Sequence, residues 1–170
     1  MDVFEAVSTV LAVRRYQDKP VPDEVIRRIV DSAHLTGSSR NLQPWHFIVV
    51  KEREMLRKLG SMAPSGPYIA DASFAVVVVI EESIFSVSDG SRAIQSMLLT
   101  AWDEGVGSNW VGFTGRYDEV KGLLGIPAEM EILALLPFGY PEATNLGKGK
   151  KNRKPFGEVV HRERFGQPFA

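Results

Sequence analysis

The spacing of apolar residues predicts five helices along the chain. A first amphipathic helix has apolar residues at helical intervals, at Val3, Val7, Val10 and Leu11. A second begins at Pro22, which suits the first turn of a helix, and ends at Gly37; its apolar face is Ile26, Ile29, Val30 and Ala33. The strongest pattern runs from residue 89 to about residue 104, where a wide stripe marks a central helix: Ile94, Met97, Leu98, Ala101 and Trp102. Shorter helices are expected over 52–60 and 117–124.

Four apolar runs predict β-strands. The clearest covers residues 74–80, whose continuous β-branched side chains indicate burial on both faces. Weaker runs cover 46–51, 108–113 and 131–137. Helices come first along the chain, and strands and helices then alternate, an order that favours an α+β fold around one sheet.

The end of the chain has a different character. Residues 141–155 are rich in proline, glycine, lysine and asparagine, which indicates exposed chain rather than a second core. A length of 170 residues suits one domain of ordinary size. We therefore expect a single domain over residues 1–170, with 141–170 forming an extended C-terminal arm.

A polar loop precedes the strand expected at 46–51. Its hydroxyl and amide side chains could hydrogen-bond the heteroatoms of a ligand, and Pro44 fixes the direction of its backbone: Ser38, Ser39, Asn41 and Gln43. A strand behind the loop would hold these groups still, as a binding site requires. Local chemistry alone favours an ordinary helix-to-strand connection with a buried Trp45, because surface loops are commonly polar.

Composition narrows the function classes. The formal net charge of −1 argues against attraction of the whole surface to nucleic acid or to anionic membranes. No apolar run reaches the length of a membrane span, and the first residues lack the basic start of a signal peptide. Cysteine is absent, which excludes disulfides, thiolate catalysis and sulfur-ligated metal, and fits a cytoplasmic protein.

Several common catalytic and cofactor-binding motifs are incomplete in this chain or absent from it. Residues 105–110 begin like a dinucleotide fingerprint but end in tryptophan and follow a helix, and 147–150 lack the spacing and the Ser/Thr of a phosphate-binding loop. His34, His46 and His161 stand alone, without metal-ligand spacing, and no Gly-x-Ser-x-Gly elbow occurs. We therefore expect neither a metal site nor a catalytic side chain.

The basic stretch in the arm has three readings: Lys148, Lys150, Lys151, Arg153 and Lys154. It could be a solvated charge run, the usual case for such sequences. Nucleic-acid binding is weaker, because no aromatic residues interleave the charges. The third reading is a phosphate contact, since Lys151 and Arg153 sit two residues apart and would project to one side of an extended segment.

Taken together, these pieces resemble the nitroreductase family of FMN-dependent oxidoreductases over nearly the whole chain. The resemblance rests on residues 13–22, with Val-Arg-Arg-Tyr-Gln-Asp-Lys-Pro-Val-Pro, on the loop from Ser38 to Trp45, and on the helix at 94–107 with its glycine-rich exit. It continues through Asn109-Trp110-Val111-Gly112, and through residues 124–127, 135–141 and 151–155. No single motif is specific, but their combination and order are.

The resemblance implies a central, mostly antiparallel sheet flanked by helices, in an intertwined homodimer with FMN at the subunit interface. It implies that Arg14 lies near the flavin N1–C2 edge, that the backbone at Val111 and Gly112 approaches N5, and that Lys151 and Arg153 hold the phosphate. The 38–43 loop would reach in from the other subunit. The full set implied for FMN is Arg14, Arg15, Tyr16, Ser38, Ser39, Asn41, Gln43, Val111, Gly112, Lys151 and Arg153.

One departure from the family pattern concerns the cofactor's phosphate. Family members commonly have Arg-Arg-Ser or similar residues where this chain has Val10-Leu11-Ala12. Val10 and Leu11 continue the first apolar stripe, and the Ala12 side chain cannot form a hydrogen bond. Losing one charged hydrogen bond costs ~1.5–3 kcal/mol, about one to two decades of affinity. We therefore expect weaker FMN binding unless Arg15, Tyr16 or the lysine-rich tail compensates.

The function that the resemblance implies is transfer of hydride from NADH or NADPH, through flavin N5, to a nitroaromatic, a quinone or another small acceptor by a ping-pong mechanism. No nucleic acid or membrane partner is expected. The alternative is an FMN-binding carrier or sensor without NAD(P)H oxidase activity.

Overall fold

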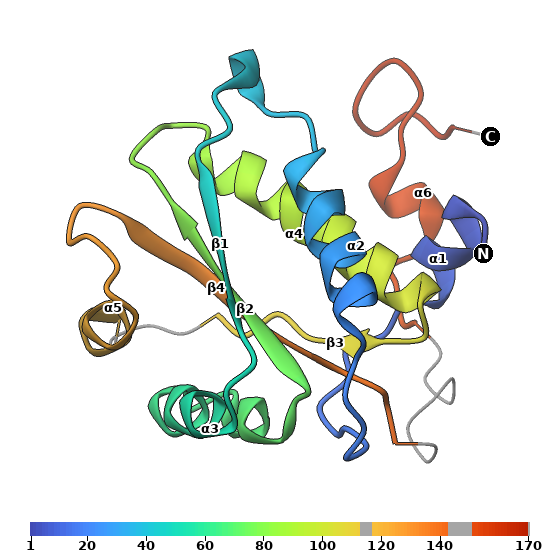
Figure 1. Cartoon of the computed structure of the whole chain (residues 1–170). Helices are drawn as coiled ribbons and strands as arrows, with labels where there is room; N and C mark the ends of the chain where they lie inside the picture. The colour runs from blue at the N-terminus through green and yellow to red at the C-terminus, as the bar shows by residue number, and fades with distance from the viewer. Residues whose placement is uncertain (113–116, 143–150, 170) are drawn as a thin grey trace.

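A computed structural model describes residues 1–112, 117–142 and 151–169 (Figure 1). Its longer helices are α1 (Val3–Thr9), α2 (Asp23–His34), α3 (Arg53–Met62), α4 (Ser86–Asp103) and α5 (Tyr117–Leu124). Short helical turns, which the apolar spacing did not predict, are η1 (Ser39–Asn41), η2 (Pro67–Asp71) and α6 (Phe156–Val159). The strands are β1 (Trp45–Val50), β2 (Phe74–Ile80), β3 (Gly107–Ser108) and β4 (Glu131–Gly139).

The four strands form one sheet in the order β1-β2-β4-β3, and every neighbouring pair is antiparallel. The prediction of an α+β fold around an antiparallel sheet is confirmed. β2 lies in the interior of the sheet and every one of its residues is buried, as the continuous apolar run indicated.

Helices cover both faces of this sheet (Figure 1). Alternate residues of β2 point to opposite sides, so Val76 packs with α2 and α4, whereas Val77 packs with α3 and α5. The core therefore has two halves that share β2 and β4. Trp45, at the start of β1, is buried in the half that faces α2 and α4.

The strand predicted over 108–113 is wrong in its bounds. β3 ends at Ser108, and Val111 then forms a separate bridge to Leu135, with two backbone hydrogen bonds of 2.9 Å. The register of β3 against β4 places Pro137 opposite Asn109, the position of the missing pair. Proline has no N–H to donate, so the ladder breaks there and resumes at Val111. Phe113 lies outside the described residues.

The first predicted helix is also shorter than its apolar pattern. α1 begins at its cap Asp2, whose side chain accepts the Glu5 N–H at 2.7 Å, and ends at Thr9. Val10 and Leu11 are not helical, because the chain turns into an extended run in which the Val13 N–H donates to the Ser108 carbonyl. Tertiary pairing thus overrides the helical spacing. The expected apolar face is exposed in this chain, and Ala6 is the buried residue of the helix.

The other bounds differ by a few residues. α4 begins three residues before the predicted start, and α2 ends at His34 rather than at Gly37. In the arm, residues 143–150 lie outside the described part, including Lys148 and Lys150 of the basic stretch. Among the described residues, no helix combines the length and the apolar character that crossing a bilayer requires.

Candidate functional site

The residues predicted to bind flavin fall into separate places in one chain. Residues 12–16 run alongside β3, because Ala12 forms a parallel bridge with Ser108. The 38–43 loop contains η1 and lies at the top of the view, far from the 12–16 segment near the bottom (Figure 1). One chain therefore does not bring the two halves of the predicted site together.

Close packing against two glycines fixes the path of the 12–16 segment. Gly107 and Gly139 are paired across β3 and β4. A Cβ at Gly107 would lie 2.5 Å from Val13 Cγ2, and a Cβ at Gly139 would lie 2.9 Å from Tyr16 Cδ1. Only residues without side chains allow the segment to approach this closely, so the two glycines determine where Arg14 emerges.

Arg14 and Arg15 are exposed, whereas Tyr16 is not. The Tyr16 ring is buried beside Val13 and Ala72, and its hydroxyl donates to the Val13 carbonyl at 2.8 Å. Burial raises the pKa of the Tyr16 phenol, so the ring stays neutral. Tyr16 therefore locks the segment in place, and its side chain has no free polar group with which to replace a phosphate ligand.

A polar cavity of about 520 Å³ opens beside this segment. Its lining combines three guanidinium groups with three carboxylates: Arg14, Arg15, Tyr16, Asp18, Arg53, Asp71 and Glu142. Arg53 is occupied with the Ala70 and Ala72 carbonyls, each at 3.1 Å. The cavity thus brings together the three predicted residues of the segment, and Arg14 and Arg15 join the carbonyl-bound Arg53 as its exposed cations.

The backbone at Val111 and Gly112 forms the neighbouring part of the site. The N–H and the carbonyl of Val111 are both bonded to Leu135, so of these two residues only Gly112 has an N–H left for a ligand within the described residues. Ser65 donates its hydroxyl to the Gly112 carbonyl at 3.3 Å. A Cβ at Gly66 would lie 2.6 Å from Val111 Cγ1, so the 65–68 turn is pressed against this backbone.

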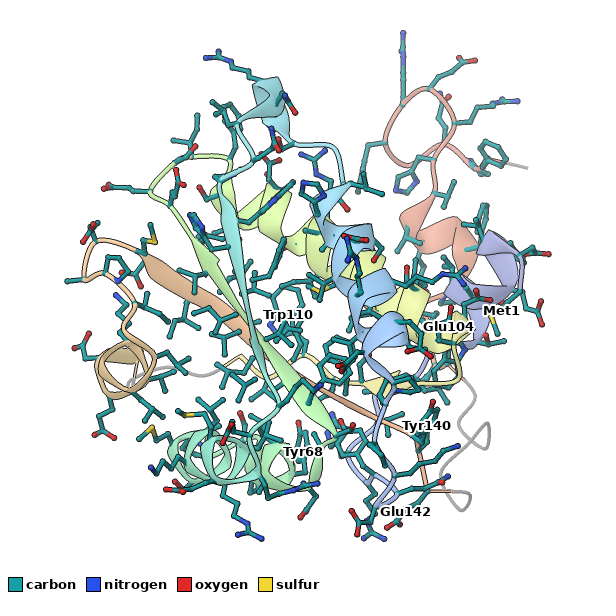
Figure 2. The ribbon with its side chains drawn as sticks, in the orientation of Figure 1. Met1, Tyr68, Glu104, Trp110, Tyr140 and Glu142 are labelled. Carbon is teal, nitrogen blue, oxygen red and sulfur yellow. The ribbon has the colours of Figure 1, made fainter. Side chains whose placement is uncertain are left out.

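The 65–68 turn was missed by the sequence analysis. Tyr68 is hydrogen-bonded to the side chain of Asn109, directly before Trp110, and its ring packs near Tyr16 (Figure 2). No periodicity marks this turn, because it joins the end of α3 to the first residues of the short η2, where Tyr68 lies. Only the fold shows that Tyr68 joins the 12–16 segment to the residues that follow β3.

The 38–43 loop has an unusual backbone. Arg40, Asn41 and Gln43 have φ angles of 54°, 55° and 50°, in the left-handed region that side chains other than glycine seldom adopt. The Ser38 hydroxyl oxygen accepts the Gln43 N–H at 2.9 Å and closes the loop. Such conformations persist only where surrounding contacts impose them, and they concentrate at functional sites.

Asp89 supplies the contact that imposes this conformation, and the sequence analysis missed its role. Its carboxylate is fully buried and accepts the Ser39 N–H at 2.9 Å and the Ser39 hydroxyl at 3.0 Å. Burial alone would raise the pKa of Asp89, but hydrogen bonds from Ser39 and Arg92 outweigh it and lower that pKa below its usual range. In the sequence, an aspartate at the start of a predicted helix indicates only an ordinary helix end.

The tail residues occupy a third place. Lys151 donates its ammonium to the Val7 carbonyl in the last turn of α1, and the Arg153 guanidinium donates to the Asn152 carbonyl at 3.1 Å. Burial, and to a lesser extent the nearby Arg153, lowers the pKa of Lys151. The tail therefore places a cation next to the Val10-Leu11-Ala12 run, which lacks polar side chains.

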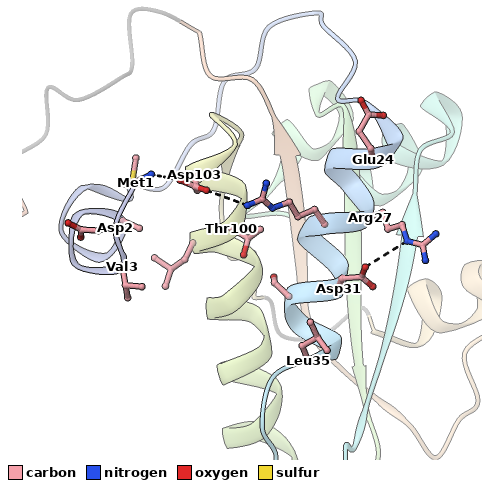
Figure 3. A pocket seen from close by; sticks show the side chains of 13 residues that line it. Met1, Asp2, Val3, Glu24, Arg27, Asp31, Leu35, Thr100 and Asp103 are labelled. Atoms are coloured by element: carbon pink, nitrogen blue, oxygen red, sulfur yellow. Dashed lines mark ion pairs between the residues drawn. The ribbon is translucent and has the colours of Figure 1, made fainter.

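A second cavity of about 520 Å³ lies between α1, α2 and α4 (Figure 3). Two of the ion pairs around it are Arg27 with Asp31, along α2 at 3.7 Å, and the Met1 ammonium with Asp103 of α4, at 2.9 Å. None of the residues predicted to bind flavin lines it. Its position makes it part of the exposed surface around α1 rather than of the candidate site.

Comparison with known proteins gives a consistent result. The model of the Nitroreductase family matches residues 11–91 and 76–140. A protein of Methanothermobacter thermautotrophicus assigned as an NADH dehydrogenase/NAD(P)H nitroreductase is 40% identical over 149 residues, covering 83% of this chain and 78% of the relative. A solved structure from Parabacteroides distasonis, assigned in the same way, has a TM-score of 0.84 at 28% identity and covers 95% of this chain and 98% of that one. An FMN-dependent nitroreductase of Clostridium difficile has the same fold, with a TM-score of 0.85 at 24% identity over 96% of this chain and 100% of that one.

Proposed function

The chain belongs to the nitroreductase family, and from that premise we propose that it is an FMN-dependent oxidoreductase that uses NADH or NADPH to reduce a small acceptor such as a nitroaromatic or a quinone. The relative at 40% identity supports the NAD(P)H-dependent activity, and the Clostridium difficile protein, which shares the fold, supports the cofactor. The observation that carries the proposal is the pairing of Ala12 and Val13 with Ser108. This pairing places the exposed Arg14 beside the segment that continues from Ser108 to Gly112.

The donor set on this surface fits an isoalloxazine ring. Arg14 offers a permanent cation for the polar N1–C2 edge, and Gly112 offers a backbone N–H without a side chain in the way. When bound, FMN would supply the redox chemistry, which is the transfer of hydride from NAD(P)H to the acceptor in two half-reactions. In this proposal the protein residues bind and orient the cofactor and the substrate.

Each group of residues has a distinct task in this proposal. Arg14 stabilises negative charge at the N1–C2 edge, which favours the reduced cofactor. The Gly112 backbone would hold the N5 edge of the flavin ring. Asn41 and Gln43 contact the cofactor from a second subunit, and Lys151 and Arg153 attract its phosphate. The lack of polar side chains at Val10-Leu11-Ala12 leaves this last task to the tail, so FMN affinity depends on Lys151 and Arg153.

We further propose that the protein works as an intertwined homodimer. Large apolar side chains that are exposed in two neighbouring parts of the chain support this proposal. In and just before α1 they are Met1, Val3, Phe4 and Val7, and in the arm beside it they are Phe156, Val159, Phe165 and Phe169. Phe4 and Phe165 are 81% and 93% exposed, which is costly in a lone chain. A second copy would cover this surface and could bring its 38–43 loop to the Arg14 side of the first.

An anaerobic spectrum tests the activity. Purified protein loaded with FMN should be yellow and should lose absorbance near about 450 nm, the flavin band, when NADH or NADPH is added. Yellow protein that stays oxidised with both nucleotides would instead favour the carrier or sensor. Protein that cannot be loaded with FMN would refute both.

Light scattering tests the homodimer. The measured mass should be that of a dimer, and Phe165→Glu should shift the measured mass toward that of the monomer if the arm forms the interface.

A further inference from the structure

We propose that Asp89 is a positioning residue of the flavin site: it holds Ser39 and thereby fixes the left-handed backbone that presents Asn41 and Gln43 to the cofactor. This inference rests on the proposed function, because it names FMN as the ligand that the 38–43 loop contacts.

The anchor itself is rigid. Asp89 lies in the first turn of α4, which packs against α2 and the sheet. The next residue, Gly90, allows this turn to approach the sheet closely, since a Cβ there would lie 2.6 Å from Leu133 Cδ2 and 3.2 Å from Ile80 Cγ2. A carboxylate on such a turn stays in place while the loop adapts to it.

Both oxygens of the carboxylate act on one residue of the loop. Oδ2 accepts the Ser39 N–H and Oδ1 accepts the Ser39 hydroxyl. Arg92, one turn further along α4, contacts the same carboxylate and lies 3.4 Å from the Ser39 hydroxyl oxygen. Arg92 and the two Ser39 donors thus compensate the charge of Asp89. Ser39 is fixed through both its backbone and its side chain.

This arrangement gives different tasks to Ser39 and Asn41, two of the four predicted loop residues. The hydrogen of the Ser39 hydroxyl is already donated to Asp89, so Ser39 acts as the attachment point. Arg40 and Asn41 follow directly in the left-handed region, which an arginine enters only under constraint. The side chain of Asn41 projects from this constrained turn and is exposed, so it remains the group that can reach a ligand.

The test compares Asp89→Asn with Asp103→Asn, a matched change near the other end of α4. Asn has the size of Asp but places an NH₂ group against the Ser39 donors, whereas Asp103 pairs with the Met1 ammonium, away from the loop. The first measurement uses FMN-free protein and follows tryptic cleavage after Arg40. We expect cleavage to accelerate about tenfold in Asp89→Asn and to stay at the wild-type rate in Asp103→Asn.

The second measurement is an FMN titration followed by flavin fluorescence. The FMN dissociation constant should rise about tenfold or more in Asp89→Asn, and adding Ser39→Ala should raise it little further, because both changes break the same contact. Faster cleavage with unchanged FMN affinity would overturn the proposal, and so would unchanged cleavage. If wild-type protein binds no FMN, the proposed function fails, and cleavage alone then decides whether Asp89 anchors the loop.

Discussion

Replacement of Gly107 by alanine tests how the Arg14 segment is held against the sheet. The added Cβ would lie 2.5 Å from Val13 Cγ2, 2.7 Å from Val13 Cβ and 2.9 Å from Pro141 Cγ. Carbon atoms pack at about 3.5–4.0 Å, so Val13 and Pro141 would each have to retreat by about 0.6–1.5 Å. Neither moves freely, because Val13 is buried and its N–H is bonded to the Ser108 carbonyl at 2.8 Å.

The expected cost is that of overpacking a tight contact, about 1–3 kcal/mol of unfolding free energy. For a protein of this size, each kcal/mol lowers the melting temperature by about 2–4 °C, so a loss of about 2–12 °C is expected for Gly107→Ala. Displacement of Val13 also moves Arg14, the next residue. FMN affinity should therefore fall even at temperatures where the variant is fully folded.

Gly122→Ala is the matched control. A Cβ at Gly122 meets nothing within 4 Å, and the residue lies in the middle of α5. Alanine there should stabilise the protein by about 0.5–1 kcal/mol, because it removes the entropic cost of glycine in a helix. Both variants are compared with wild type by thermal unfolding and by FMN titration. A Gly107→Ala protein as stable as wild type would refute the argument that the glycine pair sets the path of the 12–16 segment.

Three further changes address other parts of the site. Asn41→Gly should lower FMN occupancy, measured by absorbance, while leaving the melting temperature nearly unchanged, because the side chain is exposed and glycine accepts the left-handed backbone at this position; equal losses of both would contradict a ligand contact. Lys151→Met should weaken FMN binding and destabilise α1 by about 0.3–1 kcal/mol, because the ammonium contacts a carbonyl in its last turn; an FMN affinity independent of Lys151 would argue against the phosphate contact. The folded pKa of Asp89 is depressed, so its contribution is present above the unfolded value of about 3.9 and is lost as the pH falls through the lower folded value. In urea unfolding between about pH 4 and pH 2.5, wild type should therefore lose stability more steeply than Asp89→Asn, and parallel curves would contradict this.

The sequence was a good guide where one residue type and one local pattern suffice. The run at 74–80 was correctly predicted as a doubly buried strand, because it is short, continuously apolar and rich in β-branched residues. The stripe along α4 likewise determined a central helix, and Ile94, Met97 and Ala101 are fully buried. The family motifs depend on residue order alone, so they too could be recognised without the fold.

Local pattern failed where a distant residue decided the outcome. Helical spacing extended the first helix through Leu11, but the chain turns to pair Val13 with Ser108, and the helix ends at Thr9. The third strand was broken by Pro137, a residue of another strand that lacks the N–H the ladder needs. In both cases the residue that sets the end of the element lies far along the chain, at Ser108 or at Pro137, and the periodicity of the element itself does not depend on that residue.

The candidate site shows the same difference between local sequence and tertiary contacts. Sequence alone determined the chemistry: the cation at Arg14, the amide of Asn41 and the side-chain-free backbone at Gly112. Only the tertiary structure decided how these groups are used. It buried Tyr16, occupied both backbone groups of Val111, and made Ser39 an attachment point for Asp89. The physical reason is that residue type fixes which hydrogen bonds a group can form, whereas packing fixes which of them are already formed before a ligand arrives.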